Sequence, residues 1–132
     1  MEEKQESYDV CGQIIGAAMK VHSTLGPGFL ESVYQNALIH ELRKAGFEAE
    51  TDVLLQVIYD NVVVGNFAAD ILVNKLLLIE NKAVLGLAIA HEVQLVNYLT
   101  ATGLDEGLLL NFGGQRLEFK KKFRQHRAAP KA

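Results

Sequence analysis

The spacing of apolar residues changes its period twice along the chain, and this restricts the fold more than any other feature. Up to residue 45 the apolar positions recur as they do on one face of an α-helix. The stretch "LGPG" at 25–28 interrupts the pattern, because its glycines and proline cannot continue a helix. We therefore predict two helices, over residues 7–23 and 29–45, with Gly46 capping the second.

From residue 49 to 84 the chain is instead rich in valine, isoleucine and leucine, with turn dipeptides "DN" at 60–61 and "NK" at 74–75. This segment predicts a meander of three strands. A helical pattern returns at 87–102, and "GLLLNFGG" and "LEFKKKF" then predict two more strands. The order ααβββαββ indicates a mixed α/β fold, in which a right-handed crossover returns the fourth strand beside the meander and helices pack on the sheet.

The composition is that of one ordinary globular domain. The chain has 132 residues, of which 49% are hydrophobic and only two are proline. The first residues, "MEEKQES", are acidic where a secretory signal is basic and then apolar, and no apolar run approaches the roughly 20 residues of a membrane span. We expect a cytoplasmic protein without a membrane segment, in which the lone Cys11 is a small buried hydrophobe.

The charges are distributed unevenly. Residues 1–114 contain six Lys and Arg against fifteen Asp and Glu, whereas residues 115–132 contain seven against one. A basic tail on an acidic body is compatible with contact to nucleic-acid phosphates, because bound Lys and Arg release counterions. A solvated and frayed terminus explains the same composition, so both interpretations stay open.

A carboxylate interrupts the apolar pattern of the second helix. On a helical wheel Glu31 falls between Leu38 and Leu42, inside the apolar stripe. Burying an unpaired carboxylate costs several kcal/mol, so a core-facing Glu31 needs a hydrogen bond, a proton, an ion pair or a metal ion. The alternative is that Glu31 interacts with the free amides and the dipole of the first helical turn, worth about 0.3–1 kcal/mol.

Three further charged residues lie in apolar strands. Glu80 and Lys82 alternate onto one face of "LLLIENKAV", where an ion pair on an exposed edge is the simplest explanation, and Asp70 lies within "FAADILV". A two-residue turn at 74–75 would put Asp70 and Glu80 on opposite faces. A three-residue turn or a bulge would instead make them diagonal neighbours on one face, roughly 7–8 Å apart, and we expect this second arrangement. Two such carboxylates can hold one divalent cation, and oxygen ligands without nearby Cys or His favour Mg²⁺ or Mn²⁺ over Zn²⁺.

The helix at 87–102 carries a polar stripe formed by His91, Gln94 and Tyr98. This stripe is either a solvated helix face or a wall of the same pocket as the carboxylates. The apolar surface of this helix is expected from Ile89, Val93, Val96 and Leu99.

Several motifs together resemble a known family. "HSTLGPGFLESVYQNAL", "AAD", "IENK", "HEVQLVNYL" and "GLLLNFG", in this order and spacing, resemble the GxxExxY protein family, a RecB-like branch of the PD-(D/E)XK nuclease superfamily. The resemblance covers about residues 8–123. It implies a single restriction-endonuclease-like domain over residues 1–132, with a central sheet flanked by helices and a basic tail at 124–132.

The resemblance also implies a metal site. Asp70 corresponds to the acidic ligand at the end of the second strand, and Glu80 with Lys82 to the ExK pair on the third. Glu31 corresponds to the helix glutamate that completes the metal site, and the backbone carbonyl of Asn81 to a further ligand. The expected ion is Mg²⁺ or Mn²⁺.

Substrate contacts are implied for the last helix. Gln94 and Tyr98 match the QxxxY motif that RecB-like members use for substrate contact, and His91 joins them on the same face. Ala69 stands where the pattern has proline, a position that carries no chemistry.

The function implied by the resemblance is metal-dependent hydrolysis of phosphodiester bonds in DNA, with Lys82 orienting or deprotonating the attacking water and stabilising the transition state. One alternative is a nucleic-acid- or protein-binding module that keeps the nuclease fold without turnover, because the acidic body is a poor surface for DNA. Another is a subunit that forms a homodimer through its apolar edge strand, "VLLQVIYD".

Overall fold

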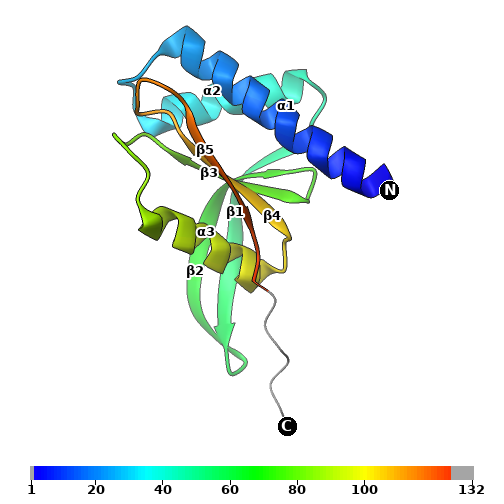
Figure 1. Ribbon diagram of the computed structural model, residues 1–132. Coiled ribbons are helices and arrows are strands. Elements are labelled where there is room, and N and C mark those ends of the chain that lie inside the picture. Colours follow the sequence, from blue (N-terminus) through cyan, green and yellow to red (C-terminus); the bar gives the residue numbers. More distant parts are fainter. Residues whose placement is uncertain (1, 126–132) are drawn as a thin grey trace.

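The computed structural model describes residues 2–125, with side chains described from residue 10, and it confirms the predicted order ααβββαββ (Figure 1). Residues 126–132, which are most of the predicted basic tail, lie outside the described residues. The elements are α1 (Glu2–Leu25), α2 (Glu31–Lys44), β1 (Ala49–Tyr59), β2 (Val62–Val73), β3 (Leu77–Lys82), α3 (Ile89–Thr102), β4 (Glu106–Asn111) and β5 (Glu118–Phe123). No helix among the described residues is long and apolar enough to cross a membrane.

The five strands form one mixed sheet in the order β1-β2-β3-β4-β5. The pairs β1–β2, β2–β3 and β4–β5 are antiparallel, which confirms the predicted meander. Strands β3 and β4 are parallel, so α3 is the crossover that connects them. The sheet therefore has two edges, β1 and β5.

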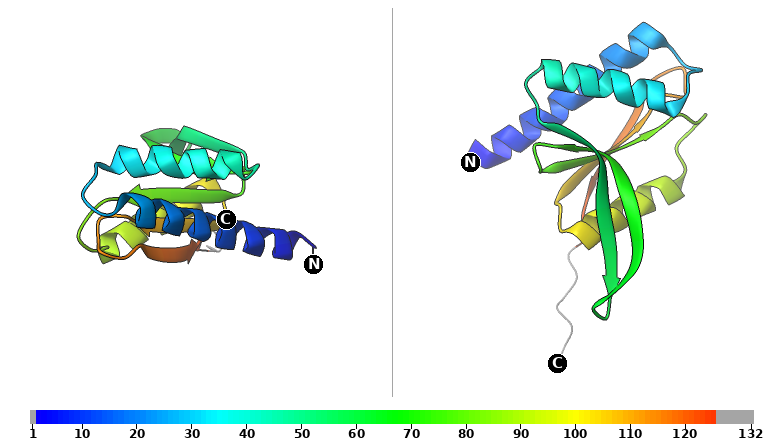
Figure 2. Two further views of the ribbon diagram at one scale, coloured as in Figure 1. Left: turned by 90° about the horizontal axis from the view of Figure 1, so that it is seen from above. Right: turned by 180° about the vertical axis from the view of Figure 1, so that it is seen from behind.

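Two cores cover opposite faces of this sheet. Alternate residues of β3 belong to different cores, because successive side chains of a strand point to opposite faces. Leu77 and Ile79 lie in the core beneath α1 and α2, together with the buried Cys11, whereas Leu78 lies in the core beneath α3. Figure 1 shows α1 and α2 lying together, away from α3, and Figure 2 shows the same arrangement from above and from behind.

The expected apolar surface of α3 is partly wrong. Leu95 and Leu99 are its buried residues, whereas Ile89 is 78% exposed and Val93 is 52% exposed. Apolar residues surround much of this helix, so the helical period alone does not select the face that meets the sheet.

A short turn sets the start of α2. Gly26 and Gly28 adopt positive φ angles of 71° and 110°, which glycine reaches without a steric penalty. The buried Tyr34 hydroxyl donates to the Gly26 carbonyl and accepts from the Phe29 amide at 3.1 Å. Tyr34 also stacks on Phe112 with ring centroids 4.9 Å apart, so this packing residue fixes the first turn of α2 against the sheet.

Candidate active site

Asp70 and Glu80 lie on neighbouring strands. Ile71 pairs with Ile79, and residues 74–76 form a three-residue turn, as expected. Continued by one position, this register sets Asp70 directly opposite Glu80, so the expectation of diagonal neighbours is wrong although the shared face is right. The Asp70 amide donates to Glu80 Oε1 at 3.4 Å, which agrees with direct opposition.

Both carboxyl groups are largely shielded from solvent. The Asp70 carboxylate accepts a hydrogen bond of 2.7 Å from the backbone amide of Asn81. Burial raises the pKa of Asp70, whereas the Asn81 hydrogen bond and the Lys82 charge oppose this rise. Glu80 is only 8% exposed, and burial together with the Asp70 charge raises its pKa to about 7. The pair is therefore costly to ionise completely, since two negative charges would share a buried position.

Glu31 approaches this pair from α2, but it does not face the core. It is the first residue of α2 and is exposed, whereas the buried residues of this helix are Tyr34, Leu38, Ile39 and Leu42. The core-facing placement expected from the helical wheel is therefore wrong. Partial burial and the Asp70 charge raise the pKa of Glu31, and the Lys82 charge lowers it, so Glu31 lies within electrostatic reach of both groups.

Lys82 completes the group. It is the last residue of β3, two positions after Glu80, and is half-buried. Its positive charge acts on Glu31, Asp70 and Glu80 alike. We call these four residues, Glu31, Asp70, Glu80 and Lys82, the acidic cluster.

Helix α3 brings one of its three polar residues to the acidic cluster. Burial, followed by the charges of Glu80 and Asp70, raises the pKa of Tyr98. Gln94 is exposed one turn earlier. The His91 ring accepts a hydrogen bond from the Ala88 amide at 3.0 Å, so this side chain also closes the start of the helix.

Three neighbours of the site were missed in the sequence. Phe67 of β2 stacks on Tyr98, with ring centroids 3.6 Å apart and planes inclined by 12°. Gln35 Nε2 donates to the Asp70 carbonyl at 3.4 Å. The Asp52 charge contributes to the raised pKa of Asp70. Asp52 could have been found in the sequence, because it is an acidic residue within an apolar strand, as Asp70 is. Nothing in the sequence pattern distinguished Phe67 or Gln35 as site residues.

Asn81 is unusual for its side chain. It is fully buried, and neither its amide nitrogen nor its carbonyl oxygen has a hydrogen-bond partner among the described residues. By contrast, the equally buried Asn111 bonds to Val84 through both groups and to Glu118. Burial of the Asn81 side chain therefore lowers the free energy of unfolding, since buried polar groups ordinarily have hydrogen-bond partners.

The oxygen-rich donor set suits a hard divalent cation. Carboxylates are the ligands that Mg²⁺ and Mn²⁺ prefer, and a cation would favour the charged form of Glu80, whose pKa is raised by burial and then by the Asp70 charge. Among residues 10–125, no three His, Cys, Asp or Glu side chains converge closely enough to hold a metal ion. Asp70 and Glu80 thus fit a metal as an adjacent pair, with Glu31 farther out.

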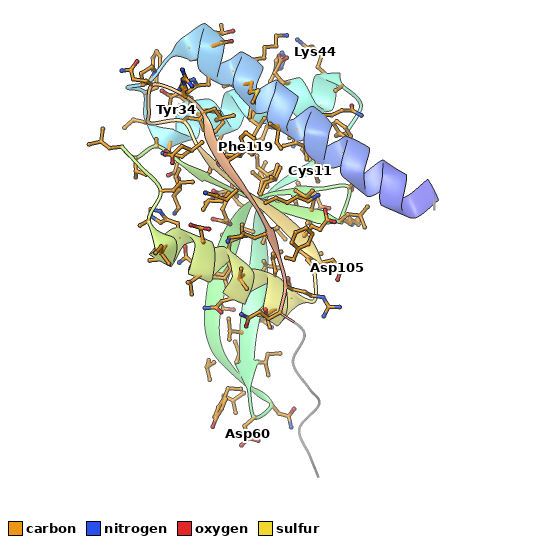
Figure 3. The ribbon with its side chains drawn as sticks, in the orientation of Figure 1. Cys11, Tyr34, Lys44, Asp60, Asp105 and Phe119 are labelled. Atoms are coloured by element: carbon orange, nitrogen blue, oxygen red, sulfur yellow. The ribbon has the colours of Figure 1, made fainter. Side chains whose placement is uncertain are left out.

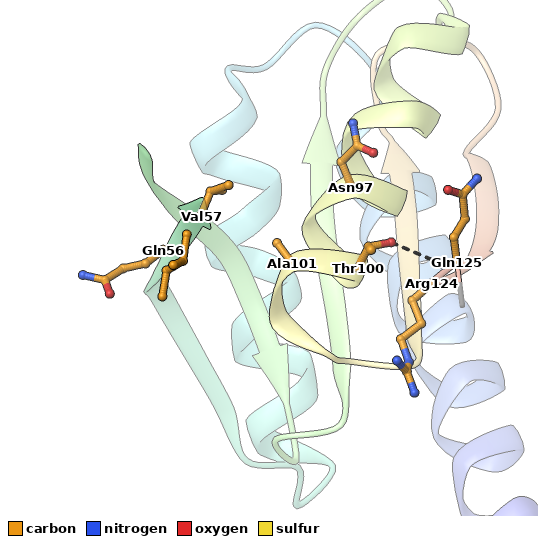
Figure 4. A pocket seen from close by; sticks show the side chains of 8 residues that line it. Gln56, Val57, Asn97, Thr100, Ala101, Arg124 and Gln125 are labelled. Carbon is orange, nitrogen blue, oxygen red and sulfur yellow. Dashed lines mark hydrogen bonds between the residues drawn. The ribbon is translucent and has the colours of Figure 1, made fainter. Parts of the chain in front are cut away.

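The pocket drawn in Figure 4 lies elsewhere. It has a volume of about 570 Å³ and is formed by β1, the end of α3 and the residues after β5. Its lining includes Gln56, Asn97, Thr100 and Arg124, and no member of the acidic cluster. We base the candidate site on the cluster, because the charged groups and their perturbed pKa values are there.

The fold and the acidic cluster define a restriction-endonuclease-like α/β domain. The chain belongs to the PD-(D/E)XK nuclease superfamily, whose family profile matches residues 8–124. A search of curated proteins gave no match. Among solved structures the chain is similar to SSO0001, with a TM-score of 0.57 and 23% identity over 74% of this chain. The match spans 52% of the SSO0001 chain, and at this identity it shows the fold alone.

Proposed function

We propose that the protein is a metal-dependent nuclease that hydrolyses phosphodiester bonds in DNA, and that it belongs to the GxxExxY branch of its superfamily. The observation that carries this proposal is the direct opposition of Asp70 and Glu80, with Lys82 at the end of the same strand. Superfamily membership favours a nucleic-acid substrate in general, and the choice of DNA follows the family resemblance. A cytoplasmic location is part of the same proposal.

In this proposal Asp70 and Glu80 hold Mg²⁺ or Mn²⁺, assisted by Glu31 and the backbone carbonyl of Asn81. When bound, the ion would polarise the scissile phosphate and lower the pKa of a coordinated water. Glu80 must first lose a proton that its surroundings favour, because its pKa is about 7 in the absence of a cation. Metal binding and deprotonation of Glu80 are therefore coupled.

Lys82 is proposed to orient the attacking water molecule and to stabilise charge; acting as the general base would require its neutral amine. Its place beside three carboxyl groups lets its ammonium group orient a water molecule and neutralise charge that develops on the phosphate. On α3, Tyr98 is held beside the cluster by its stack on Phe67, while Gln94 and His91 lie on the solvent side to contact the substrate.

The second candidate is a binding module that keeps the fold without turnover. The charge distribution favours it, because residues 1–114 contain fifteen acidic and six basic side chains and so repel nucleic-acid phosphates. The Asp70 carboxylate is also already engaged by the Asn81 amide.

The test is cleavage of plasmid DNA, single-stranded DNA and RNA with Mg²⁺ or Mn²⁺. We expect DNA cleavage, and Asp70→Asn and Lys82→Ala should each lower the rate by about 100-fold or more. The matched controls are Asp60→Asn at the hairpin tip and Lys75→Ala in the exposed turn, which should cleave normally. Cleavage that survives Asp70→Asn or Lys82→Ala would refute the mechanism. Folded protein that neither cleaves nor binds Mn²⁺ in calorimetry would favour the binding module.

A further inference from the structure

The outer part of the β1–β2 hairpin, residues 54–68, is an apolar arm. It projects past α3 and away from α1 and α2 (Figures 1 and 2), with Asp60 at its tip (Figure 3). Its large apolar side chains are more than 45% exposed: Leu54, Ile58, Tyr59, Val62, Val63 and Val64. Monomeric proteins rarely expose so many large apolar side chains close together, so the arm is a candidate interaction surface.

The exposed apolar side chains of the arm are divided between the two faces of the sheet. A register shift between Val57 and Ile58 leaves Val64 without a partner on β1. Leu54 and Ile58, with Val63 opposite Ile58, therefore share one face, whereas Tyr59 and Val62 share the other. Phe67 pairs with Leu55, so the face of Leu54 and Ile58 is opposite the one where Phe67 meets α3. Helices α1 and α2 cover the Leu54 face only nearer the body of the sheet, so Leu54, Ile58 and Val63 stay exposed within the described chain.

The two edges of the sheet are treated differently. Edge strand β5 carries Lys120, Lys121 and Lys122, and charged side chains on an edge oppose pairing with another chain. Edge strand β1 has neither charge nor proline from Val53 to Tyr59. The free backbone groups of β1 can therefore pair with another strand, whereas the lysines of β5 oppose such pairing at the other edge.

We propose that this arm is the interface of a homodimer, in which β1 pairs antiparallel with β1 of a second copy. A strand without charges is complementary to itself, because a two-fold axis then places apolar side chains beside apolar side chains with no like charges opposed. The pairing of two free edges adds backbone hydrogen bonds and brings Leu54 and Ile58 of β1 beside the β1 side chains of the second copy.

This arrangement has a consequence for the acidic clusters. The two-fold axis of an antiparallel strand pair is perpendicular to the sheet, so equivalent faces stay on the same side. Both copies of α3, and with them both acidic clusters, then face one side of the continuous sheet. If the proposed nuclease function holds, two sites face one nucleic-acid molecule.

The test is the mass of the full chain in solution by sedimentation and light scattering. We expect twice the chain mass of 14.6 kDa, and the chain mass alone for the double variant Leu54→Lys/Ile58→Lys. Both positions are more than 60% exposed, so the variant should fold, which circular dichroism checks. The matched control, Leu85→Lys in the loop before α3, replaces a leucine that is 95% exposed and should remain dimeric.

Hydrogen exchange of the β1 amides provides a second measurement. Residues 53–59 should exchange more slowly in the wild type than in the double variant. A wild type that is monomeric at all soluble concentrations overturns the proposal and assigns the arm to a different partner. A dimer that persists in the double variant, or one that is also lost in Leu85→Lys, overturns it as well. None of these measurements needs substrate or metal, so an absence of nuclease activity would leave their outcome unchanged.

Discussion

Glu80 should make the metal-free protein less stable as pH rises, and Glu80→Gln should remove most of this dependence. The pKa of Glu80 is raised from 4.5 to about 7 in the folded protein, first by burial and then by the Asp70 charge. Between these two values the folded state binds more protons than the unfolded state, so the free energy of unfolding falls as pH increases. At about 1.4 kcal/mol per pKa unit, the full fall is about 3 kcal/mol.

The assay is urea unfolding with a chelator present, at pH values that span about 4 to 8. Glutamine imitates the protonated carboxyl group, so the variant should lack the Glu80 contribution and retain the smaller ones of Asp70 and Glu31, whose pKa values are also raised by burial. The matched control is Glu48→Gln at an exposed site, which should follow the wild type. Saturating Mg²⁺ or Mn²⁺ should flatten the wild-type curve, because a bound cation favours the carboxylate.

Parallel curves for the wild type and Glu80→Gln would refute this reasoning. They would mean that Glu80 titrates alike in the folded and unfolded states, and hence that the buried pair seen here does not form in solution. A cation that leaves both curves unchanged would separately count against metal binding at Asp70 and Glu80.

Three further predictions concern stability and are checked by the same unfolding assay. Gly113→Ala should cost roughly 3 kcal/mol or more, because an added Cβ would lie 2.2 Å from the Val84 carbonyl oxygen. The control Gly86→Ala, whose Cβ would have nothing within 4 Å, should cost less than about 0.5 kcal/mol. Equal losses of stability in the two variants would contradict the close approach at Gly113. Asn111→Ala should cost about 2 kcal/mol more than Asn81→Ala, since both residues are fully buried but, among the described residues, only the Asn111 side chain has hydrogen-bond partners. A costlier Asn81→Ala would reveal a further partner of the Asn81 side chain. Tyr34→Phe should cost about 1–3 kcal/mol by removing the hydroxyl that joins the turn before α2, and an unchanged midpoint would show that this bridge contributes nothing.

The order of elements was predictable because local patterns carry it. Periodicity and turn residues located every helix and strand, and the three-residue turn at 74–76 placed Asp70 and Glu80 on one face as expected. The face of α3 was not predictable in the same way. Its apolar residues surround much of the helix, so the choice of Leu95 over Ile89 depended on the sheet against which the helix packs.

Glu31 shows where reading the helical wheel fails. The wheel placed it in the apolar stripe, but the chain enters α2 at this residue, beyond the point where the helix meets the core. Glu31 approaches Asp70 and Lys82 because Tyr34 stacks on Phe112 and so positions the first turn of α2. These contacts join residues far apart in the sequence, so the helical wheel does not contain them.

By itself, the sequence determined which chemical groups are present and how each segment folds locally, because helix and strand periods are properties of neighbouring residues. Only the tertiary structure decided that Asp70 lies opposite Glu80, that burial raises the pKa of Glu80 to about 7, and that Phe67 supports Tyr98. Only the tertiary structure placed β1 and β5 at the two edges of the sheet, so that an uncharged strand forms one edge and a lysine-rich strand the other. Desolvation, charge coupling and exposed edges depend on distances between remote segments, and such distances exist only once the chain has packed.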